Sequence, residues 1–134
     1  MAFHITAVNQ FLLDQLEIFL LSGDIKRRKN SYQNDMLTFK TATGNDWWFH
    51  VKQAPGSHVI VQCNNEEPTI RTFEEAASLA AHFSQKASSD KVEIDYTQKK
   101  NVKKPNGSKP GFVVYYTNNS MVVSPDIDGI EEVH

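Results

Sequence analysis

The alternation of apolar and polar residues is clearest between residues 46 and 63, where it predicts a β-hairpin. Successive side chains of a strand point to opposite faces of the sheet. In the first arm, Trp47, Phe49 and Val51 therefore share one face, and the residues between them share the other. We expect the first set to lie in the core.

The two arms are joined by Ala54-Pro55-Gly56-Ser57, which predicts a type II turn. Proline fixes φ at the second position of such a turn, and glycine tolerates the positive φ required at the third. With Lys52 opposite His58, the second arm divides by the same alternation. The apolar face then holds Trp47, Phe49, Val51, Val59, Val61 and Cys63, and the other face holds Asp46, Trp48, His50, Lys52, His58, Ile60 and Gln62. A slip of one residue would exchange the faces.

Two further segments show helical periodicity. Between Ile5 and Leu21, apolar residues recur at steps of three and four, and others widen the stripe beyond one face. We expect this N-terminal helix to be covered by the domain itself or by a second copy of the chain. Thr72-Phe73-Glu74-Glu75 is typical of a capping box and predicts a second helix that continues to about Ala87.

The remaining regular segments predict strands. Residues 36–41 and 92–97 each suit one strand, and residues 112–117 and 121–123 suit a hairpin. This order predicts an α+β fold, with a mixed, largely antiparallel sheet, one helix packed on a face and an additional N-terminal helix. The expected domain organisation is a helical extension over residues 1–23, one domain over residues 24–128 and an acidic tail over residues 129–134.

The charge is unevenly distributed, which changes what the net charge of −2 implies. Basic residues gather in two clusters, Lys26-Arg27-Arg28-Lys29 and the five lysines Lys99, Lys100, Lys103, Lys104 and Lys109. Such runs are often ordinary solvated surface, but they also create local positive potential on a slightly acidic chain. An anionic partner is therefore compatible with the composition.

The single cysteine, Cys63, excludes an internal disulfide and favours a reducing compartment. No stretch reaches the ~20 apolar residues that span a bilayer, and the N-terminus lacks the basic start of a signal peptide. We therefore expect a cytoplasmic protein with no membrane association.

Catalysis would have to use His50, His58, Asp46 and Cys63. Their spacing matches no common zinc motif, and the alternation places Cys63 on the opposite face from both histidines, which also argues against a cysteine–histidine nucleophile pair. A Walker A loop and a G-x-G-x-x-G motif are absent. The sequence thus predicts no catalytic residue, no metal and no cofactor. A nucleotide- or RNA-processing enzyme that uses His50 and His58 is the alternative, and two structural histidines are another.

The second face of the hairpin also suits RNA. An exposed Trp48 beside His50 and Lys52 would offer a stacking surface next to cations, which unpaired bases and phosphates require. The lysine-rich clusters would neutralise phosphates around it. If the sheet is covered on both sides, Trp48 belongs to the core instead, and the pattern alone leaves both interpretations open.

Several motifs resemble the NFACT-R domain, the RNA-binding domain near the C-terminus of bacterial fibronectin-binding-protein-like ribosome quality-control factors. They are Lys29-Asn30-Ser31-Tyr32-Gln33-Asn34-Asp35, Asp46-Trp47-Trp48-Phe49-His50, Pro55-Gly56-Ser57-His58 and Lys103-Lys104-Pro105-Asn106-Gly107-Ser108-Lys109-Pro110-Gly111. The resemblance extends from about Asp24 to Asp128 and departs from the family at Arg28, where the family has a glycine.

The resemblance implies a non-catalytic module that binds tRNA or rRNA and acts with the large ribosomal subunit in quality control of stalled nascent chains. Together, the pattern and the resemblance select as RNA-contacting residues Lys29, Asn30, Asn34, Asp35, Asp46, Trp48, His50, Lys52, Ser57, His58, Lys99, Lys100, Lys103, Lys104 and Lys109.

The family's N-terminal NFACT domain, helix-hairpin-helix and coiled-coil arms have no counterpart in this sequence. We therefore do not expect the chain to extend a stalled peptide by itself. A separate protein that supplies those domains and a homodimer through the N-terminal helix are further partners that the sequence leaves open. A protein-binding, adhesin-like domain is the third interpretation of the chain.

Overall fold

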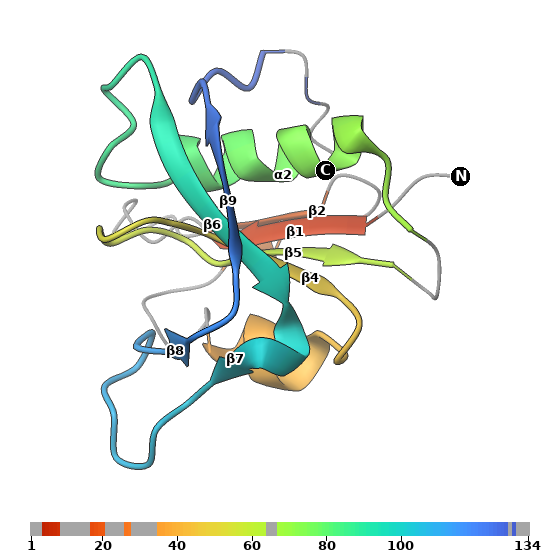
Figure 1. Ribbon diagram of the computed structural model, residues 1–134, viewed down its shortest axis with the longest axis vertical. Coiled ribbons are helices and arrows are strands. Elements are labelled where there is room, and N and C mark those ends of the chain that lie inside the picture. Colours follow the sequence, from red (N-terminus) through yellow and green to blue (C-terminus); the bar gives the residue numbers. More distant parts are fainter. Residues whose placement is uncertain are drawn as a thin grey trace.

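The computed structural model describes residues 4–8, 17–20, 26–27, 35–63, 67–128 and 130. Its centre is a seven-stranded antiparallel sheet in the order β3-β2-β1-β5-β4-β6-β9 (Figure 1). The strands are β1 (His4–Val8), β2 (Glu17–Leu20), β3 (Lys26–Arg27), β4 (Trp47–Val51), β5 (Val59–Gln62), β6 (Val92–Gln98) and β9 (Asn119–Val123). A separate ribbon pairs β7 (Val102–Lys103) with β8 (Val114–Tyr115), and the helical segments are α2 (Ile70–His82), the π-helical turn η1 (Leu37–Thr41) and the 3-10 turn η2 (Lys99–Asn101).

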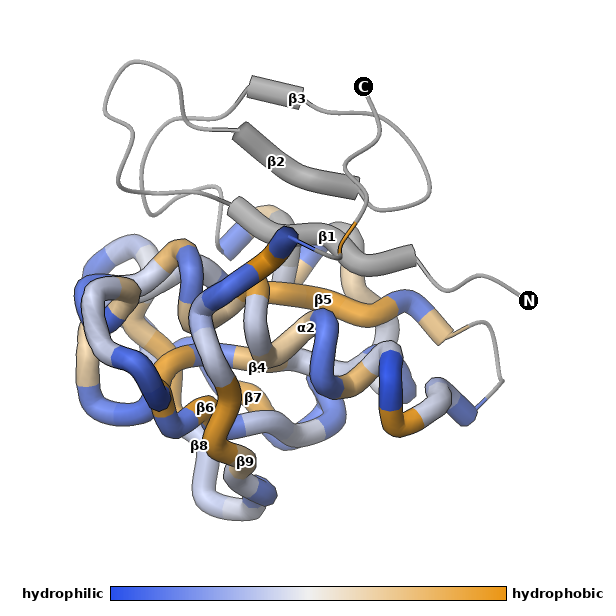
Figure 2. The backbone as a smooth tube through the Cα atoms, turned by 90° about the horizontal axis from the view of Figure 1, so that it is seen from above, coloured by the Kyte–Doolittle hydropathy of each residue, from blue (hydrophilic) through white to orange (hydrophobic). Residues whose placement is uncertain are grey.

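Both faces of the central strands are covered (Figure 1). α2 packs on one face, where its buried alanines share a core cluster with Phe49 and Val61. η1 and the β7–β8 ribbon lie on the other face, where Trp48, Ile60 and Val102 form a second cluster. In Figure 2 the hydrophobic colour is continuous along β5, in the centre of the sheet. The predicted α+β architecture, with one helix packed on a largely antiparallel sheet, is confirmed.

The division of the central hairpin into two faces is confirmed, although its register differs from the predicted one. Phe49 lies opposite Val59, and the same register brings His50, rather than Lys52, opposite His58. Because side chains alternate with a period of two, this shift of two residues leaves every side chain on its predicted face.

The predicted type II turn is wrong. Gln53 has the positive φ, of 55°, and Gly56 does not. Gly56 is needed for a different reason, since a Cβ atom there would lie 2.8 Å from Val51 Cγ1 and 3.1 Å from Ser84 Cβ. Glycine thus allows the tip of the hairpin to touch the end of the α2 region, where Gly56 bridges Ser84.

Two expected elements have a different conformation. The described parts of residues 5–21 lie in strands β1 and β2, so the predicted N-terminal helix is wrong; β1 pairs with β5 and β2 pairs with β1. An apolar run does not by itself distinguish a buried helix from a buried strand, and the unpaired edge of β5 favours the strand. Residues 36–41, expected as a strand, form mainly the η1 turn, which packs Phe39 against the second cluster.

The boundaries of two other elements also differ from the prediction. Thr69, and not Thr72, caps α2: the Thr69 Oγ1 accepts a hydrogen bond from the Thr72 N–H at 3.2 Å. The expected hairpin over residues 112–123 does not form, because β8 pairs with β7 and β9 pairs with β6. The exposed edge of β6 offers β9 a ladder of five residue pairs, which a short local hairpin cannot match.

Candidate nucleic-acid interface

Trp48 occupies the centre of the second apolar layer. None of its surface is exposed, and its ring is stacked on that of His50 with centroids 5.6 Å apart. The Tyr115 ring lies 4.8 Å from it, and the His58 ring meets it edge-on at 5.4 Å. The expectation that Trp48 is an exposed stacking platform is therefore wrong, because η1 and the β7–β8 ribbon cover this face of the sheet.

The two histidines contact Trp48 on the same face of the sheet, where His58 is buried and His50 is half-buried. Their rings meet edge-on at 5.4 Å, His58 is only 1% exposed, and its Nδ1 lies 2.8 Å from the Thr38 hydroxyl. Burial lowers the pKa of His50 and outweighs the opposing effects of nearby backbone groups and of Asp95. His50 is therefore neutral at pH 7 and does not supply the cation that was expected to face phosphate.

Lys52 is engaged within the protein. Its Nζ lies 2.8 Å from Asp95 Oδ1, and Asp95 also accepts hydrogen bonds from the Tyr115 hydroxyl at 2.7 Å and the Ser120 hydroxyl at 2.8 Å. Burial alone would raise the pKa of Asp95, but the hydrogen bonds from Lys52, Tyr115 and Ser120 hold it below its usual value. The hydrogen bond to Asp95 in turn raises the pKa of Lys52. This cluster ties β6, β8 and β9 to the end of β4. Its carboxylate balances the positive charge of Lys52.

Asp46 also has an internal role. It is 4% exposed, and its carboxylate accepts hydrogen bonds from the N–H groups of Thr43 at 2.8 Å and Cys63 at 3.0 Å. Burial, followed by the charge of Asp46, raises the pKa of Cys63 to about 11, so the thiol stays protonated. Ser57 is fully buried as well. Neither Asp46 nor Ser57 is accessible to a macromolecule in this structure.

Exposed positive charge gathers in residues 99–109, which we call the lysine-rich loop. Lys100, Lys103 and Lys109 are exposed, and the Nζ of the half-buried Lys99 lies 5.6 Å from the centre of the Phe39 ring. η2 and the β7–β8 ribbon carry these residues away from the main sheet (Figure 1). The sequence therefore identified a basic loop that the fold presents to solvent.

Lys104 and Asp35 hold this loop in shape. Lys104 Nζ lies 3.2 Å from Asp35 Oδ2 and donates to the carbonyl groups of Lys109 and Phe112, the latter at 3.0 Å. The Gly111 N–H donates to Asp35 Oδ1 at 3.1 Å. Both residues were predicted to contact RNA, but these contacts account for them as internal supports of the loop. Lys29, Asn30 and Asn34, also predicted to contact RNA, lie outside the described residues.

Two aromatic residues that the sequence reasoning did not select are exposed beside this loop. Phe112 is 53% exposed and Tyr116 is 87% exposed. The only sequence signal for them is alternation within Phe112-Val113-Val114-Tyr115-Tyr116. That signal gives no orientation until the partner strand is known, because a shift of one residue would exchange the buried and exposed tyrosines.

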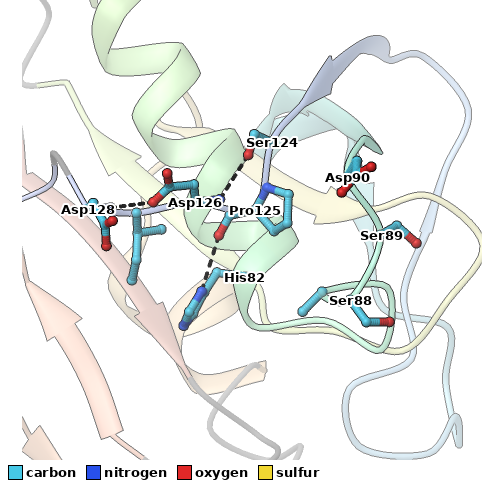
Figure 3. Close-up of a pocket in the computed structure, with 10 residues that line it drawn as sticks. His82, Ser88, Ser89, Asp90, Ser124, Pro125, Asp126 and Asp128 are labelled. Carbon is cyan, nitrogen blue, oxygen red and sulfur yellow. Dashed lines mark hydrogen bonds between the residues drawn. The ribbon is translucent and has the colours of Figure 1, made fainter.

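An open pocket of about 390 Å³ lies at the other end of β6, between the end of α2 and the segment after β9 (Figure 3). His82 Nδ1 lies 3.2 Å from the carbonyl oxygen of Pro125 and ties this segment to α2. The carboxylates of Asp90, Asp126 and Asp128 line the pocket. They would repel phosphate, so the pocket is not part of a nucleic-acid surface.

Within residues 35–63, 67–128 and 130, no group of three or more His, Cys, Asp or Glu side chains is arranged to hold a metal ion. None of the helices in the described part of the chain is long and apolar enough to cross a membrane.

Comparison with known proteins identifies the class. The family model of the NFACT protein RNA binding domain matches residues 25–117. The chain therefore belongs to this family. The resemblance found in the sequence motifs is thereby confirmed.

The particular relatives are much longer proteins. The chain is 46% identical over 102 residues to the Rqc2 homolog RqcH of Bacillus subtilis, covering 76% of this chain and 18% of the relative. It is 43% identical over 105 residues to the Rqc2 homolog RqcH of Streptococcus suis, covering 78% of this chain and 19% of the relative. The solved C-terminal part of the fibronectin/fibrinogen-binding protein from Streptococcus suis superposes with a TM-score of 0.71 at 44% identity, over 75% of this chain and 41% of that one.

Proposed function

We propose that this chain is an RNA-binding module that holds tRNA or rRNA through the lysine-rich loop, residues 99–109. The observation that carries the proposal is the exposure of Lys100, Lys103 and Lys109 on a loop whose shape the Lys104–Asp35 ion pair maintains. Cations on a fixed loop can neutralise phosphates without a large ordering cost, and phosphate contacts dominate affinity for nucleic acids. Membership of a family described as RNA-binding supports the same conclusion.

The proposal describes a binding role without catalysis. His58 is buried, His50 is half-buried and stacked on Trp48, Cys63 is a buried thiol, and Asp95 accepts hydrogen bonds from Tyr115 and Ser120. These are the groups that an RNA-processing enzyme would need to bring to a substrate, and they are occupied in holding the fold. No observation favours the enzymatic alternative over RNA binding.

The proposal extends to ribosome-associated quality control in the cytoplasm. Relatives named Rqc2 homolog RqcH support it, but the chain spans less than a fifth of their length. The activity of a whole RqcH protein would therefore require the remaining domains from the same polypeptide or from a separate one. A homodimer through an N-terminal helix is not proposed, because the described parts of that segment are strands.

The charge mechanism is tested by replacing two exposed lysines. The double variant Lys100→Gln and Lys109→Gln should weaken tRNA binding and lower the slope of log affinity against log salt by roughly 0.7 to 0.9 for each phosphate that is no longer neutralised. Titrations of labelled tRNA at several salt concentrations measure both quantities. Lys91→Gln is the matched control, because Lys91 is exposed but lies before β6, a strand roughly 23 Å long whose other end joins η2.

Unchanged affinity of the double variant at low salt would show that the loop is not the RNA surface. An equal reduction in Lys91→Gln would show that only overall charge matters. Crosslinking the protein to RNA in cells and sequencing the attached RNA would then identify whether tRNA or rRNA is bound.

A further inference from the structure

The β7–β8 ribbon has one face toward the protein and one face toward water. Val102 pairs with Tyr115, and Lys103 pairs with Val114. Val102 is 3% exposed and belongs with Trp48 to the second apolar cluster, against which Tyr115 packs. The alternation of side chains then sends the opposite set of the ribbon away from the sheet.

That outer set is aromatic and basic. By alternation it contains Phe112, Val114 and Tyr116 from the β8 strand and its flanks, and Lys103 from β7. The exposures agree, since Phe112 is 53% exposed, Tyr116 is 87% exposed and Lys103 is exposed. Five large apolar side chains are exposed among the described residues. Phe112 and Tyr116 are the two aromatic ones.

The support beneath this surface is rigid. The Tyr115 hydroxyl donates to Asp95 at 2.7 Å, and Lys104 Nζ donates to the Phe112 carbonyl group at 3.0 Å. Each of the two exposed rings is therefore on, or next to, a residue that is fixed to the body of the domain. A backbone held in this way reduces the ordering cost when a ligand binds to the rings that it carries.

We propose that Phe112 and Tyr116 form a stacking surface for unpaired RNA bases, with Lys103 and Lys109 beside it to meet the phosphates. This inference rests on the proposed RNA-binding function and specifies which form of RNA the loop prefers. Every base has a face that can stack on an aromatic ring, but only bases outside a duplex can place that face on a protein side chain. The neighbouring lysines favour a nucleic acid over an apolar protein partner, which would have to bury their charges.

The experiment compares two RNAs on the same variants. Tyr116→Ala and Phe112→Ala are titrated with a labelled oligouridine and with a blunt RNA duplex carrying the same number of phosphates. Tyr116→Ala should weaken binding of the oligouridine about 5- to 150-fold, with little change in its salt slope and little change for the duplex. Tyr116→Trp should restore the affinity, since it restores an aromatic face.

Ile70→Ala is the matched control, because Ile70 is 78% exposed but begins α2 on the other side of the sheet. It should leave both affinities unchanged. Thermal unfolding and circular dichroism establish that each variant is folded. If Tyr116→Ala is unfolded, the binding test uses Phe112→Ala instead.

Each other outcome overturns the inference in a distinguishable way. One such outcome is that both aromatic variants bind oligouridine normally while the double variant Lys100→Gln and Lys109→Gln binds it weakly. In that case the proposed stacking surface is wrong and the proposed function stands. If the lysine variant also binds normally, both fail. If the aromatic variants lose as much affinity for the duplex as for oligouridine, the surface has no preference for unpaired bases. Normal RNA affinity with reduced sedimentation on ribosomes would assign the surface to a protein partner.

Discussion

At the residue scale, Asp95 determines which neighbouring polar groups remain available to a ligand. Its carboxylate holds Lys52, Tyr115 and Ser120, so a lysine on the predicted RNA face is bound to the protein itself. The same bonds fix Tyr115 with its ring against Trp48. One buried carboxylate thus removes Lys52 from the expected RNA surface.

We expect Asp95→Ala to destabilise the domain by about 2 to 4 kcal/mol, because three donors lose a charged acceptor. Lys52 contributes the smaller part, since 30% of its side chain is exposed and water screens the charge that remains. Urea denaturation measures the change, and Asp90→Ala, at an exposed aspartate, should alter stability by less than about 0.5 kcal/mol. A destabilisation below about 1 kcal/mol for Asp95→Ala would show that the cluster is not a stabilising centre.

At the element scale, the tip of the central hairpin is joined to the end of the α2 region. The Ser57 N–H donates to the Phe83 carbonyl group and the Gln85 N–H to the Pro55 carbonyl group, both at 3.0 Å. This double link requires the two backbones to approach closely, and the missing side chain of Gly56 permits it. The hairpin and the helix are therefore one packed unit.

Gly56→Ala should destabilise the domain by about 1 to 3 kcal/mol, because its Cβ would lie 2.8 Å from a Val51 methyl group and one of the two elements must shift. Gly44→Ala is the control. A Cβ at Gly44 would lie 3.6 Å from Lys100 Cβ, an ordinary distance, and φ there is not positive. Chemical denaturation of both variants tests the explanation, and equal stabilities would contradict it.

At the scale of the whole molecule, charge is separated along β6. The exposed lysines of residues 99–109 lie beyond one end of this strand, and the aspartates of the pocket in Figure 3 lie at the other. Such a separation would orient an approaching polyanion toward the loop even though the net charge is −2. The division expected at residue 24 between an extension and the domain stays a prediction.

Global stability should decrease as the pH falls below about 6.5, the ordinary pKa of histidine. The folded-state pKa of His50 is lower, because of burial, so in this range the unfolded chain binds a proton that the folded chain does not. One such proton changes the free energy of unfolding by at most about 1.4 kcal/mol per pH unit. The groups nearest to His50 are His58 and Asp95; the lowered pKa of Asp95 affects stability only below about pH 3.9.

Unfolding free energies of the wild type and His50→Gln between about pH 7.5 and 5 test this prediction. The wild type should lose stability more steeply below about pH 6.5 than the variant, and the difference isolates His50 from His58. Parallel profiles would mean that His50 has the same pKa in both states.

Much of the fold was accessible from sequence because burial on strands and helices leaves a periodic signal. The faces of the central hairpin, the helix after residue 69 and the strand from Val92 follow from that signal. The predicted site was less accurate for the same reason. Trp48 and His50 lie on the second face of a strand, and alternation states only that they share a face, without stating whether another layer covers it.

Two properties follow from the amino-acid order alone: the family, through contiguous motifs, and the position of the basic loop, because a short segment with five lysines cannot be buried as a whole. Which side chains meet solvent depends on how distant segments pack. The covering of the second face requires η1, which precedes the hairpin, and the ribbon, which is distant from the hairpin in sequence and forms only when β8 pairs with β7. Those long-range contacts buried Trp48 and exposed Tyr116, because register and layering arise from packing between segments and leave no mark within either one.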